Sequence, residues 1–156
     1  KKDELFCAKN GEIISDKLHG QMPNSAIIRI ENPDAESLDL NLFSRNYVIA
    51  RGFAISYDKY AKRLRIDRSD LTNQLNVEYG TERQIILENG LTSMDILVDH
   101  STVEIFVNEG EYVLSARIFP TKEEHMIRMG GKNLNLSIWS AEQTVDDAPI
   151  FFAENQ

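Results

Sequence analysis

An antiparallel two-sheet β-sandwich, of jelly-roll or concanavalin-like type and with about ten to twelve strands, is the fold class that the sequence predicts. Three observations support it. Short runs alternate apolar and polar residues, turn signals separate these runs at short intervals, and no stretch has the period of a long amphipathic helix. At 156 residues the chain suits one domain, and we expect residues 1–156 to form it.

Residues 93–120 are the clearest part of this pattern and predict a three-stranded β-meander. The runs Met94–Asp99 and Thr102–Val107 alternate with period two, as half-buried strands do. A third run, Glu111–Phe119, alternates again and stops at Pro120, which cannot donate a hydrogen bond to a sheet.

Two turns join the three runs. Asp99-His100-Ser101 follows the first, because Asp and Ser side chains accept hydrogen bonds from nearby backbone amides. Asn108-Glu109-Gly110 closes the second hairpin, and we expect Gly110 to take a left-handed conformation, which glycine adopts without steric cost.

Further short strands are predicted on both sides of the meander. Asn10-Gly11 predicts an opening hairpin, and Gly130-Gly131 predicts a two-residue turn. Leu75–Glu78 is a weaker strand candidate, and Thr81–Glu88 suits either a helix or a strand. The clearer runs are Leu5–Ala8, Ile13–Ser15, Ala26–Ile30, Leu38–Phe43, Phe53–Tyr57, Arg63–Asp67, His125–Met129 and Asn133–Ser140.

The stretch VDHSTVEIFVNEGEYVLSARIFP, residues 98–120, resembles the signature of the C-terminal β-sandwich module of glycoside hydrolase family 32. Residues 64–69, which end in Asp-Arg-Ser, and residues 136–139 resemble two further segments of that module. His100 stands where the family usually has arginine. The resemblance gives a structural or interface role to the matching residues Asp99, Ser101, Glu104, Phe106, Asn108, Gly110, Arg117 and Phe119.

This resemblance implies a module that does not itself catalyse. Family 32 contains β-fructosidases that act on sucrose, sucrose 6-phosphate or fructans without a metal, and their catalytic carboxylates lie in an N-terminal β-propeller. The motifs that carry those carboxylates, Asn-Asp-Pro-Asn-Gly, Arg-Asp-Pro and Glu-Cys, do not occur in the chain. We therefore expect no catalytic, cofactor-binding or metal-binding residues here, and a module that stabilises the propeller of the same polypeptide.

The resemblance also carries expectations about assembly. The module is expected to border the propeller's substrate cleft or a homodimer interface. The chain begins at Lys1 rather than at Met, so we expect either a processed chain or an excised piece, and the resemblance favours a piece of that longer enzyme.

Composition opposes two classes of partner. Twenty-five acidic residues against 17 basic ones give a net charge of −8, which disfavours nucleic acid and anionic membranes. No run approaches the roughly 18 apolar residues of a membrane helix. The single cysteine, Cys7, excludes an internal disulfide. The acidic balance and the single cysteine favour a cytoplasmic sucrose-6-phosphate hydrolase as the parent enzyme.

The carboxylates of the meander do not form an obvious glycosidase pair. Asp95 and Asp99 lie on one strand face about 13 Å apart, whereas a retaining pair needs a separation of about 5 to 5.5 Å. Glu104 lies beyond the turn, and we expect it to pair with a donor such as Arg117.

Nucleophilic and metal sites are also disfavoured. Asp99, His100 and Ser101 are consecutive, so they cannot converge as a hydrolase triad does. The other histidines and Cys7 are scattered and lack the spacing of metal ligands.

The meander carries apolar residues on both faces. Phe106 lies opposite the Val103-Ile105-Val107 face, and Ile118 and Phe119 are adjacent and must point to opposite sides. A sheet with one face in water should read apolar inside and polar outside. We therefore expect one face of this sheet to pack in the sandwich and the other to dock on another domain.

Two alternatives remain open from the sequence. The first is an independent, lectin-like carbohydrate-binding module, for which Tyr60 in a polar loop is the best exposed aromatic candidate. Trp139 is a better candidate for a core or interface residue. The second is an immunoglobulin-like adhesion module, which composition alone would allow.

Overall fold

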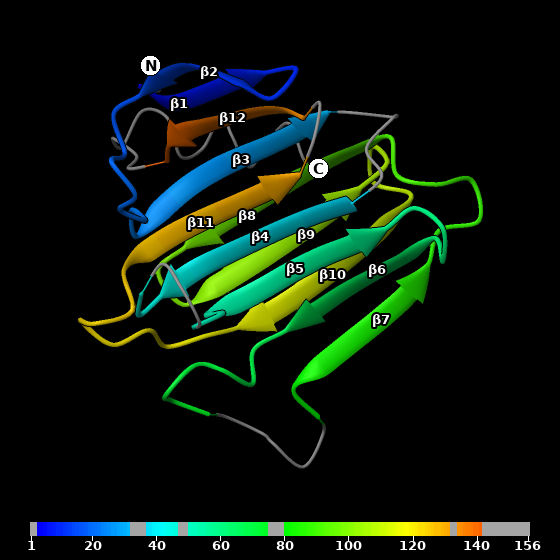
Figure 1. Ribbon diagram of the computed structural model, residues 1–156. Helices are drawn as coiled ribbons and strands as arrows, with labels where there is room; N and C mark the ends of the chain where they lie inside the picture. Colours follow the sequence, from blue (N-terminus) through cyan, green and yellow to red (C-terminus); the bar gives the residue numbers. More distant parts are fainter. Residues whose placement is uncertain (1–2, 32–36, 47–49, 75–79, 132–133, 142–156) are drawn as a thin grey trace, which may run out of the picture.

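Twelve β-strands and no helix are found in residues 3–31, 37–46, 50–74, 80–131 and 134–141, which are the residues that the computed structural model describes (Figure 1). The strands form two antiparallel sheets that pack face to face, so the predicted all-β sandwich is confirmed. None of the described residues forms a helix that could span a membrane.

The larger sheet has seven strands in the order β10-β9-β8-β3-β12-β1-β2. Its strands are β1 (Glu4–Lys9), β2 (Glu12–Asp16), β3 (Ser25–Glu31), β8 (Ser93–Asp99), β9 (Thr102–Val107), β10 (Tyr112–Arg117) and β12 (Asn135–Ser140). The five-stranded sheet has the order β11-β4-β5-β6-β7. Its strands are β4 (Ser37–Ser44), β5 (Phe53–Asp58), β6 (Arg63–Asp67), β7 (Glu82–Ile86) and β11 (Met126–Gly131).

The core lies between the sheets and follows from the period-two alternation of the strands. Met94, Ile96 and Val98 of β8 are buried, and so are Val103 and Ile105 of the adjacent strand β9. The facing sheet contributes every second residue of its central strands, namely Leu38, Leu40, Leu42, Phe53, Ile55, Tyr57, Leu64 and Ile66. Because both sheets direct one apolar face inward, water is excluded from a single continuous core.

The predicted turns of the first half and of the meander are confirmed. Asn10 and Gly11 both have positive φ, at 51° and 83°, between β1 and β2. In the meander, Asp99 pairs with Thr102 across the first turn. Gly110 has φ +92° in the second turn, where Glu109 is also left-handed.

Other parts of the chain differ from the expectation or resolve it. Gly130 and Gly131 do not form a turn: they continue β11 and pair with Asp39 and Leu38 of β4. The ambiguous segment Thr81–Glu88 contains β7, which pairs with β6. The weaker candidate Leu75–Glu78 lies outside the described residues, and so does Asn133 at the start of the last predicted strand.

The two sheets are offset rather than stacked edge on edge. Figure 1 shows that β1 and β2 extend past β11 at one side, whereas β7 extends past β10 at the other. The offset leaves β7 without a strand of the larger sheet opposite it.

Candidate functional site

The signature residues lie along the β8–β9–β10 meander, and the turns use two of them as local braces. Asp99 Oδ1 accepts a hydrogen bond from Ser25 Oγ on the neighbouring strand β3, at 3.1 Å, and lies 2.8 Å from His100 Nδ1. The Asp99 carboxylate therefore ties its turn to β3. Ser101 contributes its backbone oxygen, which accepts from the amide of Ile118 at 2.8 Å.

Asn108 holds the second turn against the preceding loop. Its Oδ1 accepts hydrogen bonds from the backbone amides of Thr92, at 2.8 Å, and Ser93, at 3.3 Å. Its Nδ2 donates to the Gly90 carbonyl oxygen at 2.8 Å. This side chain satisfies three backbone groups at once, so its role is structural.

Glu104 and Arg117 do not form the expected pair. The strand register sets Glu104 opposite Ser115 and sets Arg117 opposite Thr102. Among the described residues no ion pair joins Glu104 to Arg117. Instead, the Arg117 guanidinium lies over the Phe119 ring, 5.6 Å from its centroid.

The described residues do not assemble a hydrolytic or metal centre. Asp95 forms an ion pair with Arg29 at 2.8 Å, so it is not free to serve as one half of a carboxylate pair. Ser25 and Asp99 both approach the same nitrogen of His100, Nδ1, whereas a triad uses both ring nitrogens. No cluster of His, Cys, Asp or Glu in the described part of the chain could hold a metal ion.

The outer face of the seven-stranded sheet, the face turned away from the core, carries an apolar patch. Leu97 of β8 pairs with Ile27 of β3, and Ile27 pairs with Trp139 of β12, so the three side chains form a row across adjacent strands. In the next row Phe106 of β9 pairs with Val113 of β10. We call these five residues the outer patch.

Most of the outer patch is only half-covered. Leu97, Ile27, Trp139 and Phe106 are half-buried, and Val113 is 52% exposed. Phe119, just beyond β10, is 37% exposed. Phe106 and Phe119 are thus not enclosed in the sandwich core.

The outer face of the five-stranded sheet is polar and internally paired. Arg65 of β6 donates a hydrogen bond to Glu82 of β7 and lies 3.3 Å from Asp67 Oδ2. Arg128 of β11 donates to Asn41 Oδ1 of β4. The hydrogen bond to Glu82 raises the pKa of Arg65, and the same contact lowers the pKa of Glu82. Charged side chains satisfied in this way suit a face in contact with water.

A cleft of about 440 Å³ opens at the edge of the sandwich where β7 extends past β10. Its apolar lining comes from both sheets, and its polar lining includes residues of the predicted signature and of the Asp-Arg-Ser segment. We call it the open-edge cleft. It is lined by Phe53, Ile66, Arg68, Gly80, Thr81, Glu82, Arg83, Thr102, Val103, Glu104, Ser115, Ala116 and Arg117.

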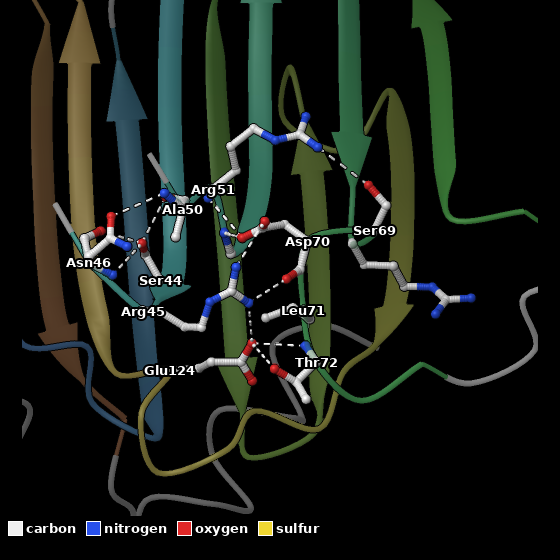
Figure 2. Close-up of polar contacts among 12 residues, drawn as sticks. Ser44, Arg45, Asn46, Ala50, Arg51, Ser69, Asp70, Leu71, Thr72 and Glu124 are labelled. Carbon is white, nitrogen blue, oxygen red and sulfur yellow. Dashed lines mark hydrogen bonds and ion pairs between the residues drawn. The ribbon is translucent and has the colours of Figure 1, made fainter. Parts of the chain in front are cut away.

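A polar cluster, which we call the loop clamp, joins the loops after β4, β6 and β10 (Figure 2). Asp70 is one centre of it: its Oδ2 accepts from the backbone amides of Arg51, at 2.8 Å, and Gly52, at 2.7 Å. Arg45 donates to the Asp70 carbonyl oxygen at 2.8 Å and also pairs with its carboxylate. Asp70 therefore fixes the entry into β5.

Glu124 is the second centre of the loop clamp, and its side chain is fully buried. It accepts hydrogen bonds from the backbone amides of Thr72 and Thr121, both at 2.9 Å. Arg45 Nη1 lies 3.5 Å from Glu124 Oε2, the oxygen that also accepts from the Thr72 amide. A buried carboxylate is tolerated because these donors compensate for its lost hydration.

The sequence did not reveal the loop clamp. Glu124 stands beside the exposed Glu123 in a charged loop, and nothing in the local pattern separates the two. The one available signal was the acidic residue Asp70 directly after the Asp-Arg-Ser segment. The aromatic prediction fared better in one respect: Tyr60 is indeed exposed, at 82%, and Trp139 lies in the outer patch.

Comparisons with known proteins agree on one family. The profile described as "Glycosyl hydrolases family 32 C terminal" matches residues 8–143. The chain is 36% identical over 95 residues to a sucrose-6-phosphate hydrolase of Streptococcus mutans, a match that covers 60% of this chain and 19% of that protein. It is 28% identical over 139 residues to the Bacillus subtilis sucrose-6-phosphate hydrolase, covering 85% and 27%.

Solved structures share the fold. A sucrose-6-phosphate hydrolase from Lactobacillus gasseri superimposes with a TM-score of 0.71 and 25% identity, over 90% of this chain and 28% of that one. An exo-inulinase from Aspergillus awamori gives a TM-score of 0.63 at 17% identity, over 90% and 28%. The chain therefore spans less than a third of each of these proteins.

Proposed function

Because the chain belongs to the C-terminal module family of glycosyl hydrolase family 32, we propose that it stabilises the catalytic β-propeller of the same polypeptide through its outer patch. The module does not itself catalyse. The parent would be a β-fructosidase of the sucrose-6-phosphate hydrolase type, acting on sucrose 6-phosphate, sucrose or a fructan, and located in the cytoplasm.

The contrast between the two outer faces carries this proposal. The five-stranded sheet presents paired charges, whereas the seven-stranded sheet presents five apolar side chains in two adjacent rows, beside the Arg29–Asp95 ion pair. Monomeric proteins rarely leave a contiguous apolar patch in water without a partner. The relatives supply the partner, since each has a much longer chain than the part that this module matches.

The pairing of several carboxylates with basic residues supports the division of labour. In the described part of the chain, Asp95 is bound to Arg29, Asp67 to Arg51 and Arg65, and Glu124 to the loop clamp. Hydrolysis of a glycosidic bond needs an acid and a second carboxylate placed about the scissile bond. The chemistry would then belong to the propeller and the module would supply stability.

The test is a charge substitution on each outer face of the parent enzyme. Leu97→Asp buries a carboxylate in the proposed interface, so we expect the propeller to lose thermal stability and to become separable from the module by limited proteolysis. Ile86→Asp is the matched control, because Ile86 is an exposed apolar residue of the other sheet. Activity is assayed with sucrose 6-phosphate, sucrose and a fructan on the same samples.

Two outcomes decide the matter. Equal melting temperatures of the parent enzymes that carry Leu97→Asp and Ile86→Asp would contradict docking through the outer patch. Hydrolysis of any of the three sugars by the 156-residue chain alone would contradict the non-catalytic role. Sedimentation of the parent enzyme tests, in addition, the homodimer that the family resemblance implies.

A further inference from the structure

The open-edge cleft holds an arginine on the inner side of an edge strand. Arg83 of β7 pairs with Ile66 of β6, and Ile66 is buried, so Arg83 lies on the face that the sheet turns toward the core. Arg83 is nevertheless exposed. Across the cleft, β10 places the small residue Ala116 on its inner side.

The cleft is locally basic in an acidic protein. Arg68, Arg83 and Arg117 line it, together with Glu82 and Glu104. The Glu82 carboxylate is already bonded to Arg65, which lies outside the cleft lining. Among the described residues Arg83, Arg117 and Glu104 make no ion pair, so two unpaired guanidinium groups face one unpaired carboxylate, while the whole chain carries −8.

Arg68 is held in position before any ligand arrives. Its backbone amide donates to the Thr81 carbonyl oxygen at 3.0 Å, which ties the loop after β6 to the start of β7. Its guanidinium donates to Gln74 Oε1 at 3.1 Å and to the Gly80 carbonyl oxygen at 3.3 Å. An arginine already fixed in place loses less conformational entropy when an anion binds.

The remaining lining suits a small organic molecule. Phe53, Ile66, Val103 and Ala116 form an apolar floor, and Thr81, Thr102 and Ser115 place hydroxyl-bearing residues around it. A volume of about 440 Å³ lies in the range of small-ligand sites, which combine an apolar lining with a few polar groups.

We propose that the open-edge cleft binds a small organic phosphate, such as a sugar phosphate. The phosphoryl group would bond to Arg83 and Arg117, since guanidinium groups match phosphate oxygens with two parallel hydrogen bonds. The carbon skeleton would lie against the floor at Val103 and Ala116. A neutral sugar fits less well, because stacking needs an accessible ring and the one aromatic lining residue, Phe53, is buried.

Because Thr102, Glu104, Ser115 and Arg117 lie on the same outer face as the outer patch, the cleft is tested in the 156-residue chain, where docking on the propeller plays no part. Titration calorimetry of the 156-residue chain at constant ionic strength tests it with three probes: fructose 6-phosphate, inorganic phosphate and fructose. We expect fructose 6-phosphate to bind most tightly, inorganic phosphate more weakly and fructose not at all. Binding of fructose 6-phosphate should weaken as salt is added.

Arg83→Gln is the decisive variant, and Arg63→Gln is its matched control. Arg63 is an exposed arginine of the same sheet, in the neighbouring strand, but it lies outside the cleft. We expect Arg83→Gln to weaken fructose 6-phosphate binding about tenfold or more, and Arg63→Gln to leave it unchanged. Circular dichroism verifies that both variants fold.

Three results would overturn the proposal. They are no binding of fructose 6-phosphate at millimolar concentration, equal weakening by both arginine variants, and equal affinity for inorganic phosphate and fructose 6-phosphate. The last would show that the apolar floor contributes nothing and that the cleft is not a site for an organic phosphate.

Discussion

Gly52 lies at the most crowded backbone position of the molecule's loop clamp. Its φ is +57°, a left-handed conformation that residues with a Cβ rarely adopt. A Cβ built there would lie 2.3 Å from the Leu42 carbonyl oxygen and 2.8 Å from the Phe43 backbone. The Gly52 amide also donates to Asp70, so the backbone cannot retreat without breaking that bond.

We predict that Gly52→Ala destabilises the chain by about 2 to 4 kcal/mol, from backbone strain and overpacking together. Gly110→Ala is the matched control: Gly110 is also left-handed, at φ +92°, but a Cβ there meets nothing within 4 Å. Strain alone should cost about 1 kcal/mol at Gly110. Urea unfolding of both variants measures the difference, and equal costs would exclude the steric explanation. Gly110→Val should cost more than Gly110→Ala, because valine is β-branched.

The Arg65–Glu82 contact predicts a pH dependence. The hydrogen bond from Arg65 lowers the pKa of Glu82 below its ordinary value of 4.5. Near that value the folded state therefore binds fewer protons than the unfolded state, so this contact stabilises the fold above pH 4.5 and the gain is lost as pH falls through the lowered pKa.

We expect the Glu82→Gln variant to be less stable than the unsubstituted 156-residue chain at neutral pH. The two stabilities should converge as the solution is acidified below the lowered pKa of Glu82. Urea midpoints measured at neutral and acidic pH provide the comparison. Glu88→Gln, at an exposed position beyond the end of β7, is the control. If the difference in urea midpoint between Glu82→Gln and the unsubstituted chain stays constant across this pH range, the Arg65 contact does not stabilise the fold.

At the scale of elements, the loop clamp connects what the strands leave open. The described residues of the loops after β4, β6 and β10 have no ladder hydrogen bonds to each other, and Asp70 and Glu124 supply bonds between these loops (Figure 2). The clamp also anchors the loop that carries Arg68, through Asp70 and the Thr72 amide, and so it supports one wall of the open-edge cleft.

Glu124→Gln should destabilise the chain by about 1 to 3 kcal/mol, because an amide NH₂ replaces an acceptor that faces buried N–H donors. Glu123→Gln is the control, since Glu123 is exposed in the same loop. Thermal unfolding of the two variants gives the comparison. A Glu124→Gln chain as stable as Glu123→Gln would mean that the donors are equally well satisfied without the carboxylate.

How far the sequence predicts an element depends on whether the signal is local. The meander was predictable because alternation, Asn108 and Gly110 all lie within it. Gly130-Gly131 misled, because a glycine pair also fits a strand, and the partner that makes β11 continuous is β4, distant in sequence. The clamp could not be predicted at all, since Asp70 and Glu124 meet their partners only after both sheets have formed.

At the scale of the whole molecule, the two outer faces differ in what they require. The outer patch keeps Phe106 half-buried on the face opposite the core, where the resemblance and the alternation had placed it. Its neighbour Ile105, on the same strand, is 1% exposed and packs inside. The two side chains therefore report separately on docking and on folding.

Phe106→Ala should cost about 1 to 2 kcal/mol in the 156-residue chain, and distinctly more in the parent enzyme if the outer patch docks. Ile105→Ala should cost about 2 to 5 kcal/mol in both contexts. Unfolding by urea of both variants in both proteins gives the four values required. An identical cost of Phe106→Ala in the two contexts would leave the outer patch without a partner.

The edge strand β2 determines whether another strand can extend the larger sheet. It ends that sheet and presents Ile13 and Ile14, which are 65% and 60% exposed, between Glu12 and Asp16. The register of β1 against β2 shifts between Cys7 and Ala8, so Ile14 is the extra residue of a bulge, which interrupts the regular ladder that a second copy of β2 would need. Two exposed isoleucines thus lie at a sheet edge that the bulge and the carboxylates of Glu12 and Asp16 protect against pairing with a second copy.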